Sequence, residues 1–151
     1  MTTDIRPTRT TRRPWHLWVV AIVGFAVYVG GARDYLCIAL GDTDYIEHQF
    51  GSGGVGYFTG YPIALRALWT LNIVTGLLAP ILLVARSRWT PLVALAGAVA
   101  EVVLLVLTFT LRDRWTALGP TTAFFDIAIA LLTAAIAWYA WAVPRPDGRA
   151  D

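Results

Sequence analysis

The stretch PLVALAGAVAEVVLLVLTFTL, which occupies residues 91–111, carries a single charged side chain, Glu101. The hydrocarbon core of a bilayer is about 30 Å thick, and an α-helix of about 20 apolar residues crosses it. This stretch therefore has the length and the composition of a transmembrane helix, and we predict one over residues 90–111.

Three further stretches of the chain share these properties. Hydrophobic residues make up 57% of the sequence and charged residues 15%, whereas soluble domains have about 45–50% and about 25%. The additional helices are predicted at residues 15–40, 62–85 and 121–143. Because the connections are short, neighbouring helices should run antiparallel. The predicted fold is all-α: a polytopic membrane protein in which residues 15–143 form an up-down-up-down bundle of four transmembrane helices, between tails at residues 1–14 and 144–151.

The distribution of arginine predicts the orientation of this bundle. The helix ends on the side of the chain termini hold eight of the 12 basic residues, all of which are arginine, and the opposite ends hold four. Segments rich in Arg and Lys stay in the cytoplasm. We therefore expect a multi-pass protein of the bacterial inner (cell) membrane with both termini in the cytoplasm. The glycine-rich segment 41–61 would face outward, and residues 44–50 within it could form a short amphipathic turn.

The beginning of the chain allows a second interpretation. Arg12-Arg13, the apolar stretch that follows and Gly30-Gly31-Ala32 resemble a secretory signal peptide, whose cleavage would leave three helices and an outward N-terminus. The apolar stretch is about 18 residues long, however, whereas that of a signal spans about 7–15. An uncleaved first helix is the favoured interpretation, and cleavage remains the alternative.

Each predicted helix has one face on which small or polar residues recur at positions i, i+3, i+4 and i+7. Membrane helices associate through such faces because small side chains let the backbones approach closely. The faces consist of Gly24, Tyr28, Gly31 and Tyr35; Leu68, Asn72, Thr75, Gly76 and Ala79; Ala94, Gly97, Ala98 and Glu101; and Thr122, Asp126, Ala130, Thr133 and Ala137. We predict that these faces point into the bundle.

Charged and polar side chains inside the predicted helices are the candidates for a functional site. A charge at a helix centre costs about 2.5–3.5 kcal/mol on insertion scales, so such residues usually pair or mark transport pathways. The candidates are Glu101, Asp126, Asp34, Arg33, Arg66 and Asn72. The charged members lie at the midplane or in the outward half, as in a vestibule open to the outside. In a purely structural alternative, Arg33 and Arg66 extend to the outer headgroups and pair with Asp34 and Asp126.

Glu101 has no such simple structural explanation. It lies near the membrane midplane, from which a short carboxylate does not reach the headgroups. It must meet Arg66, Asn72 or a threonine hydroxyl, or else be protonated. A protonated, hydrogen-bonded structural residue and a proton carrier of coupled transport explain this position equally well.

No motif for catalysis, cofactors or nucleic acid accompanies these residues. Cys37 is the single cysteine, which excludes an intramolecular disulfide. His16 and His48 lie too far apart to be the axial ligands of a haem, and no HExxH, Walker or GxGxxG motif is present. No basic groove interleaved with aromatic residues indicates nucleic-acid binding. We expect no metal, no cofactor and no enzymatic activity.

Several short motifs within residues 15–89 resemble a known group of proteins. They are Trp15-His16-Leu17-Trp18, Arg33-Asp34-Tyr35, Tyr57-Phe58 with Tyr61-Pro62, Leu68-Trp69, Gly76 and Arg86-Ser87-Arg88-Trp89. In these motifs the chain resembles small four-helix bacterial membrane proteins that are uncharacterised and often labelled "sugar transporter" by automated naming. The resemblance implies four helices and an uncleaved first helix. It implies no particular chemistry, and Glu101 matches no position in the group.

The sequence thus favours a non-enzymatic integral inner-membrane protein, for which we consider two roles. The first is a small-solute or proton-linked transport component, with Glu101 as proton carrier and Asp126, Asp34, Arg33 and Arg66 lining an outer vestibule. The second is an accessory or assembly protein that binds the membrane helices of a partner through its small-residue faces. Besides the lipid bilayer, the expected partners are a second copy of the chain or another membrane protein.

Overall fold

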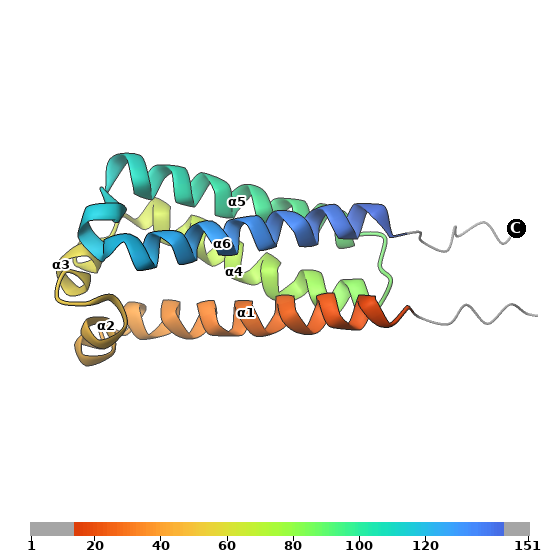
Figure 1. Cartoon of the computed structure of the whole chain (residues 1–151), viewed down its shortest axis with the longest axis horizontal. Coiled ribbons are helices and arrows are strands. Elements are labelled where there is room, and N and C mark those ends of the chain that lie inside the picture. The colour runs from red at the N-terminus through yellow and green to blue at the C-terminus, as the bar shows by residue number, and fades with distance from the viewer. Residues whose placement is uncertain (1–13, 144–151) are drawn as a thin grey trace, which may run out of the picture.

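A computed structural model describes residues 14–143 of the chain, and every element in this part is a helix (Figure 1). Four helices are long and apolar enough to cross a membrane. They are α1 (Trp15–Ala39), α4 (Ile63–Val84), α5 (Thr90–Leu111) and α6 (Arg114–Ala142). Two short helices, α2 (Thr43–Phe50) and α3 (Gly54–Phe58), connect α1 to α4. The predicted tails lie outside the described residues, apart from Pro14.

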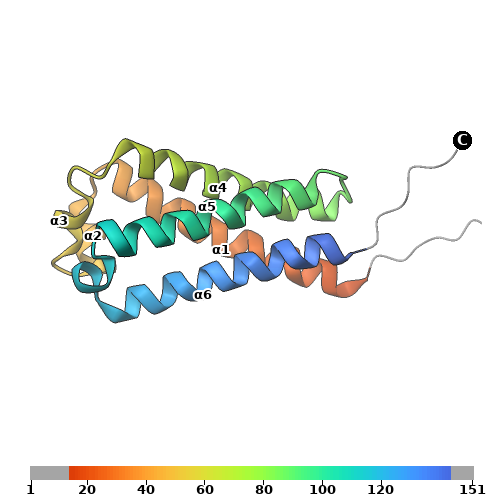
Figure 2. The same cartoon turned by 90° about the horizontal axis from the view of Figure 1, so that it is seen from above.

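The four long helices form an antiparallel bundle, as predicted (Figures 1 and 2). α1 packs against α4, α4 against α5, and α5 against α6, whereas α1 and α6 contact each other more sparsely. We call the end of the bundle that holds Trp15, Ala142 and the α4–α5 turn the terminal end. The opposite end, which holds α2, α3 and the α5–α6 connection, is the capped end. The protein is therefore a multi-pass membrane protein with four spans, by helix length and composition.

The predicted inner faces are the faces that pack against one another. Gly76 of α4 lies against the ring of Tyr28, and a Cβ atom added to this glycine would be 2.0 Å from the ring. A Cβ atom on Gly97 of α5 would be 2.9 Å from the Thr75 hydroxyl. Such distances leave no room for a side chain, so α1, α4 and α5 approach as closely as they do because these residues are small. Ala79, Ala94, Ala98, Ala137 and Ala140 form a cluster of buried residues between α4, α5 and α6.

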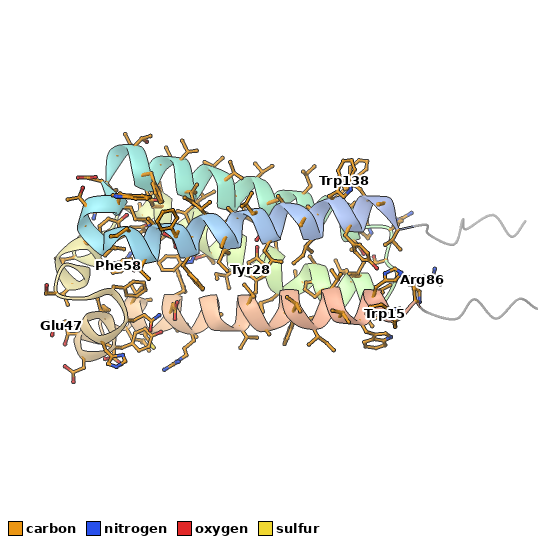
Figure 3. All side chains as sticks on the ribbon, in the orientation of Figure 1. Trp15, Tyr28, Glu47, Phe58, Arg86 and Trp138 are labelled. Atoms are coloured by element: carbon orange, nitrogen blue, oxygen red, sulfur yellow. The ribbon has the colours of Figure 1, made fainter. Side chains whose placement is uncertain are left out.

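The outer surface of the bundle is apolar, as a surface in contact with lipid must be. Large hydrophobic side chains are exposed along all four long helices. Trp15 is 76% exposed and Trp138 is 78% exposed, and both lie near the terminal end (Figure 3). Exposed tryptophans at helix ends are typical of the membrane interface.

The connection between α5 and α6 differs from the loop that the sequence suggested for residues 112–120. The chain turns at Asp113 and is helical again from Arg114 onward. This helical turn is separated from the rest of α6 by a break at Gly119, where φ is 82° and ψ is 165°. Only glycine adopts this backbone conformation readily, and Pro120 is well suited to begin the helix that follows because it needs no amide donor.

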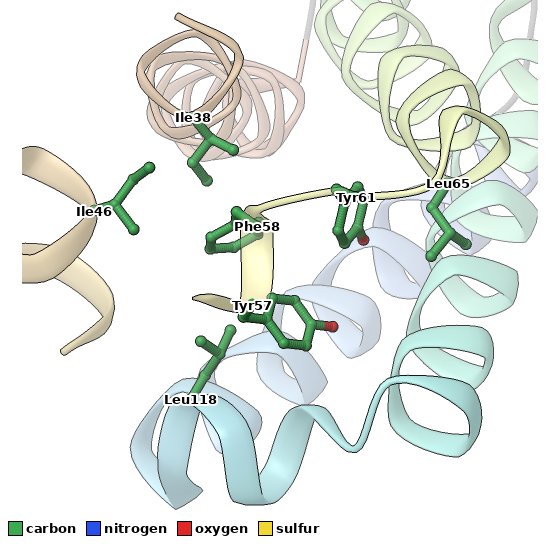
Figure 4. Close-up of a cluster of buried hydrophobic side chains, with 7 residues drawn as sticks. All are labelled: Ile38, Ile46, Tyr57, Phe58, Tyr61, Leu65 and Leu118. Carbon is green, nitrogen blue, oxygen red and sulfur yellow. The ribbon is translucent and has the colours of Figure 1, made fainter. Parts of the chain in front are cut away.

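The capped end is closed by α2, α3 and an aromatic cluster. Asp42 accepts a hydrogen bond from the amide of Tyr45 and so caps the first turn of α2. The segment expected to form an amphipathic turn is therefore a short helix, which buries Ile46. The buried side chains of the cluster come from α1, the two short helices, the connection between α3 and α4, α4 and α6 (Figure 4); they are Ile38, Ile46, Tyr57, Phe58, Tyr61, Leu65 and Leu118.

Candidate functional site

A cavity of about 560 Å³ lies between the four long helices in the half of the bundle near the capped end. Ligand sites in proteins have volumes of about 300–1,000 Å³ and combine apolar walls with a few polar groups. The walls here include Val27, Ile73, Leu104, Leu105, Phe125 and Ile129. The polar groups include Asp34, Asn72, Glu101, Thr108, Arg114 and Asp126. The cavity therefore brings together four of the six candidates from the sequence, namely Glu101, Asp126, Asp34 and Asn72.

Arg114 and Asp126 form an ion pair in this cavity. The Arg114 Nε donates to Asp126 Oδ2 over 2.5 Å, and Nη2 donates to Oδ1 over 3.2 Å. The two residues are 12 positions apart, so a straight helix would place them about 18 Å apart at about 1.5 Å per residue. The break at Gly119 folds the first turn of α6 back, and the guanidinium thereby reaches a carboxylate farther along the same helix.

The guanidinium groups of Arg112 and Arg114 lie on tyrosine rings of the aromatic cluster. The Arg112 guanidinium carbon is 5.1 Å from the centroid of the Tyr57 ring and 5.5 Å from that of Tyr61, and the Arg114 carbon is 5.6 Å from that of Tyr57. These distances are typical of cation–π contacts. Arg112 also donates a hydrogen bond to the carbonyl oxygen of Tyr57. Arginine–tyrosine contacts, as well as apolar contacts, thus join α3 and the segment after it to the end of α5 and the start of α6.

The two tyrosines also present hydroxyl groups in the interior of the capped end. Figure 4 shows both hydroxyls pointing away from α2. The Tyr57 hydroxyl is buried and has no hydrogen-bond partner among the described residues. Burial and the neighbouring Tyr57 raise the pKa of Tyr61, which also lines the cavity, to about 12 from its ordinary value of 10.

Glu101 is the ionisable residue of α4 and α5 that lines the cavity, and it does so from α5. Its side chain is partly buried. Within residues 14–143 no group forms a hydrogen bond or an ion pair with its carboxylate. The predicted partners are engaged elsewhere or lie apart: the Asn72 amide donates to the Gly97 carbonyl oxygen over 3.0 Å, and Arg66 is not among the residues that line the cavity.

A layer of hydrogen-bonded side chains closes the cavity toward the terminal end. Tyr28 lies between α1 and α6 in the middle of the bundle (Figure 3), and its hydroxyl is 3.0 Å from the Thr133 hydroxyl. The Asn72 amide donates to the same Tyr28 oxygen over 3.4 Å. On the terminal side of this layer lies a gap of about 10 Å³, which is enough for about one water molecule at most. The cavity therefore reaches the middle of the bundle and ends there.

Asp34 has another partner than the structural alternative suggested, and the two arginine candidates do not line the cavity. Asp34 lines the cavity and accepts a hydrogen bond from the Tyr45 hydroxyl. Burial, this hydrogen bond and the charge of Asp34 raise the pKa of Tyr45 to about 12. The Arg33 guanidinium carbon lies 5.1 Å from the centroid of the Tyr45 ring. In the part of the chain that the structure describes, neither Arg33 nor Arg66 forms an ion pair, so the pairs with Asp34 and Asp126 that the structural alternative required are not formed.

Arg114 lines the cavity and pairs with Asp126, and the sequence did not single it out as a candidate. The sequence predicts a loop over residues 112–120, before the last helix, and therefore places Arg114 in it. The available signal was the dipeptide Gly119-Pro120, which marks a break in an otherwise helical segment. No group of three or more His, Cys, Asp and Glu side chains among residues 14–143 is arranged to hold a metal ion.

Comparisons with family models, with curated proteins and with solved structures find no match for this chain. The helices and the cavity define the class by themselves: an integral membrane protein with four spans and a cavity that holds polar groups in the half near the capped end. The resemblance to small four-helix bacterial membrane proteins agrees with this class at the level of helix number alone.

Proposed function

We propose that the protein is a non-enzymatic component of small-solute transport in the bacterial inner membrane, and that transport is linked to a proton on Glu101. The observation that supports this role most directly is the cavity that holds Glu101, Arg114 and Asp126 together between four helices long and apolar enough to cross a membrane. Ionisable groups inside a membrane are costly and mark the pathways of solutes and protons. A residue that served only to stabilise the fold would be expected to have a partner, and Glu101 has none among the described residues.

The position of the cavity fits one state of a transporter that is open on one side at a time. The site reaches the middle of the bundle from the capped end, and the layer at Tyr28 and Thr133 closes it toward the terminal end. Transporters hold their substrates near the midplane and expose them alternately to the two sides. With the termini in the cytoplasm, as the arginine distribution predicts, this site lies in the outward half of the bundle.

The groups that face Glu101 across the cavity decide how it exchanges a proton. They are Tyr28 of α1, Asn72 of α4, and Arg114 and Asp126 of α6. Arg114 is already paired with Asp126, so the Glu101 carboxylate has no cation of its own. A carboxyl group in this position can bind a proton when the site is empty and release it when another positive charge arrives.

The alternative role, an accessory protein that binds a partner's helices, rests on small-residue faces. In the structure these faces are used inside the bundle itself, as the contacts of Gly76 with Tyr28 and of Gly97 with Thr75 show. The outward faces carry large apolar side chains. Transport is therefore the better supported role. Because four helices rarely enclose a complete pathway, we expect the working unit to be a homodimer or larger.

The experiment that tests this proposal is infrared difference spectroscopy of the protein in lipid at a series of pH values. We expect a carboxyl stretching band that responds to bulk pH between about 5 and 8, the range useful for proton transfer, and that disappears in Glu101→Gln. The matched control is Glu47→Gln, an exposed carboxyl on α2 outside the cavity, which should leave the band unchanged. A folded protein whose Glu101 band ignores bulk pH would contradict proton linkage.

A further inference from the structure

We propose that the cavity binds a lipophilic organic cation, and that this cation reaches it from the bilayer through a mouth between α1 and α6. The inference rests on the proposed function, because it takes the cavity as the solute site and names the class of solute. Three observations carry it: the balance of charge in the cavity, the chemistry of its walls and the place where it opens.

The charge of the cavity is negative and incompletely neutralised. Its lining contains three carboxyl groups, those of Asp34, Glu101 and Asp126, and one guanidinium group, that of Arg114. Arg114 is paired with Asp126, and Asp34 accepts the hydrogen bond from Tyr45. Arg33, next to Asp34, is exposed and lies on the Tyr45 ring. The Glu101 carboxylate remains as the site that a cation would neutralise, whereas an anion would be repelled.

The walls of the cavity favour a cation that carries a large apolar body. Apart from the charged groups, the lining is dominated by aliphatic and aromatic side chains, including Ile73, Leu104 and Trp69. Aromatic faces attract cations as well as apolar groups. The volume of about 560 Å³ exceeds the need of an inorganic ion and suits a drug-sized organic molecule. A small hydrophilic cation such as ammonium would leave most of these walls without a contact.

The mouth lies where α1 and α6 separate. The hydrogen bonds that join the two helices, His16 to Tyr139 and Tyr28 to Thr133, lie toward the terminal end and at the middle of the bundle. In Figure 2 the two ribbons are close at the terminal end and separate toward the capped end. Gly30 of α1 lines the cavity and is exposed on the bundle surface, with open space around its Cβ position. Phe125 of α6 also lines it and is 62% exposed. Both residues thus connect the cavity with the lipid-facing surface.

The test compares two probes of the same shape and opposite charge, tetraphenylphosphonium and tetraphenylborate. Each is titrated into the full-length protein in lipid nanodiscs, with protein-free nanodiscs of the same lipid as the reference for partitioning. We expect saturable binding of the phosphonium alone. In Glu101→Gln its affinity should fall at least about tenfold, because a contact between unlike charges is lost. Asp44→Asn, which removes an exposed carboxyl on α2 outside the cavity, should bind as the wild type does.

The mouth between α1 and α6 is tested by placing a large side chain in it. Gly30→Phe should slow the association of the phosphonium, whereas Val29→Phe, on the neighbouring lipid-facing position that does not line the cavity, should not. Saturable binding of the borate with equal affinity, or no saturable binding of the phosphonium to the folded wild type, would overturn the cation site. Unchanged association in Gly30→Phe would overturn the lateral mouth.

The two proposals fail in different ways. If the infrared band of Glu101 responds to bulk pH and the phosphonium does not bind, proton linkage stands and the class of solute is wrong. If the phosphonium binds through Glu101 and the band ignores bulk pH, the cation site stands and proton-linked transport is wrong.

Discussion

The two halves of this bundle are built from the same four helices and differ in almost everything else. Toward the terminal end, alanines and glycines bring the helices into close contact around a gap of about 10 Å³. Toward the capped end, the same helices enclose about 560 Å³ and carry an ion pair and a carboxyl group without a partner. One half is a packed membrane core, and the other resembles a binding site.

The difference arises from what lies between α1 and α6. At the terminal end they are joined directly, by His16 and Tyr139. At the capped end, the residues that α2 and α3 contribute to the cluster lie between Ile38 of α1 and Leu118 of α6 (Figure 4). The fit is close, because a Cβ atom on Gly53 would be 2.4 Å from the Ala117 carbonyl oxygen. The short helices therefore act as a spacer, and a site is formed in a small bundle by holding one pair of helices apart.

The largest effect is expected from Asp126→Asn, which leaves the Arg114 guanidinium partly buried without a counter-charge. Removing one partner of a buried pair costs about 3 kcal/mol of unfolding free energy. Unfolding in mixed micelles with increasing denaturing detergent measures this loss. The double variant Arg114→Gln/Asp126→Asn should recover a large part of it. If the single variant is as stable as the wild type, the ion pair does not stabilise the capped half. The proposed difference between the two halves would then be wrong in this respect.

The next largest effect is expected from Gly76→Ala, at the boundary between the two halves. The new methyl group would lie 2.0 Å from the Tyr28 ring, and overpacking of this kind costs about 2 kcal/mol. Because the ring must move, the hydrogen bond from Tyr28 to Thr133 should also be lost and the cavity should gain access toward the terminal end. Gly30→Ala, where nothing lies within 4 Å, is the control and should be close to neutral by the same detergent titration.

A smaller effect is expected from Gly119→Ala, because the backbone there has φ 82° and ψ 165°. A side chain in this conformation costs about 1 kcal/mol or more. The variant should also weaken the Arg114–Asp126 pair, because the first turn of α6 would tend to continue straight. A double-mutant cycle with Asp126→Asn measures this coupling. Gly56→Ala on α3, a glycine with open space and without positive φ, serves as the comparison, and equal losses at the two positions would contradict the explanation.

The smallest effect is confined to the capped end and appears at high pH. The pKa of Tyr45 and the pKa of Tyr61 are raised to about 12, above the ordinary value of 10 that applies after unfolding. Folding thus favours the protonated phenols. Their contribution to stability is fully present below pH 10 and is lost as pH rises through about 12. Absorbance titration of the folded protein should show that Tyr45→Phe/Tyr61→Phe loses two phenols that ionise near pH 12 and keeps the same number that ionise near pH 10.

Much of the fold could be predicted from the sequence because it depends on local patterns. The four spans follow from the lengths of the apolar stretches, and the inner faces follow from small residues at helical spacing. The buried positions of Gly24, Gly76, Gly97 and Thr133 agree with that spacing. Small residues at helical spacing favour close contact between helices, so in a membrane helix they are expected on the face that packs against a neighbour and not on the face that meets lipid.

The site was harder to predict because it depends on where the chain bends. The pairing of Arg114 with Asp126 requires a break between them, and the sequence places Arg114 in a loop in which its direction is undetermined. The same holds for Arg33, whose guanidinium lies on a tyrosine that α2 supplies. The cost of charges inside a membrane pointed to the carboxyl groups that line the cavity. It did not identify the arginine that pairs with them, because charge alone does not determine which side chains lie within reach of one another.

The break at Gly119 also has a consequence for the synthesis of the protein. A newly made helix must leave the translocation machinery for the lipid before its neighbours are in place, and an arginine within its apolar core would oppose that step by about 2.5–3.5 kcal/mol. Arg114 precedes the break, so the segment that inserts into the lipid can begin at Pro120. The arginine then stays at the aqueous surface during insertion. Folding of the first turn then carries the positive charge sideways into the finished bundle. A charge that no nascent helix needs to bring through lipid is thereby delivered to the interior.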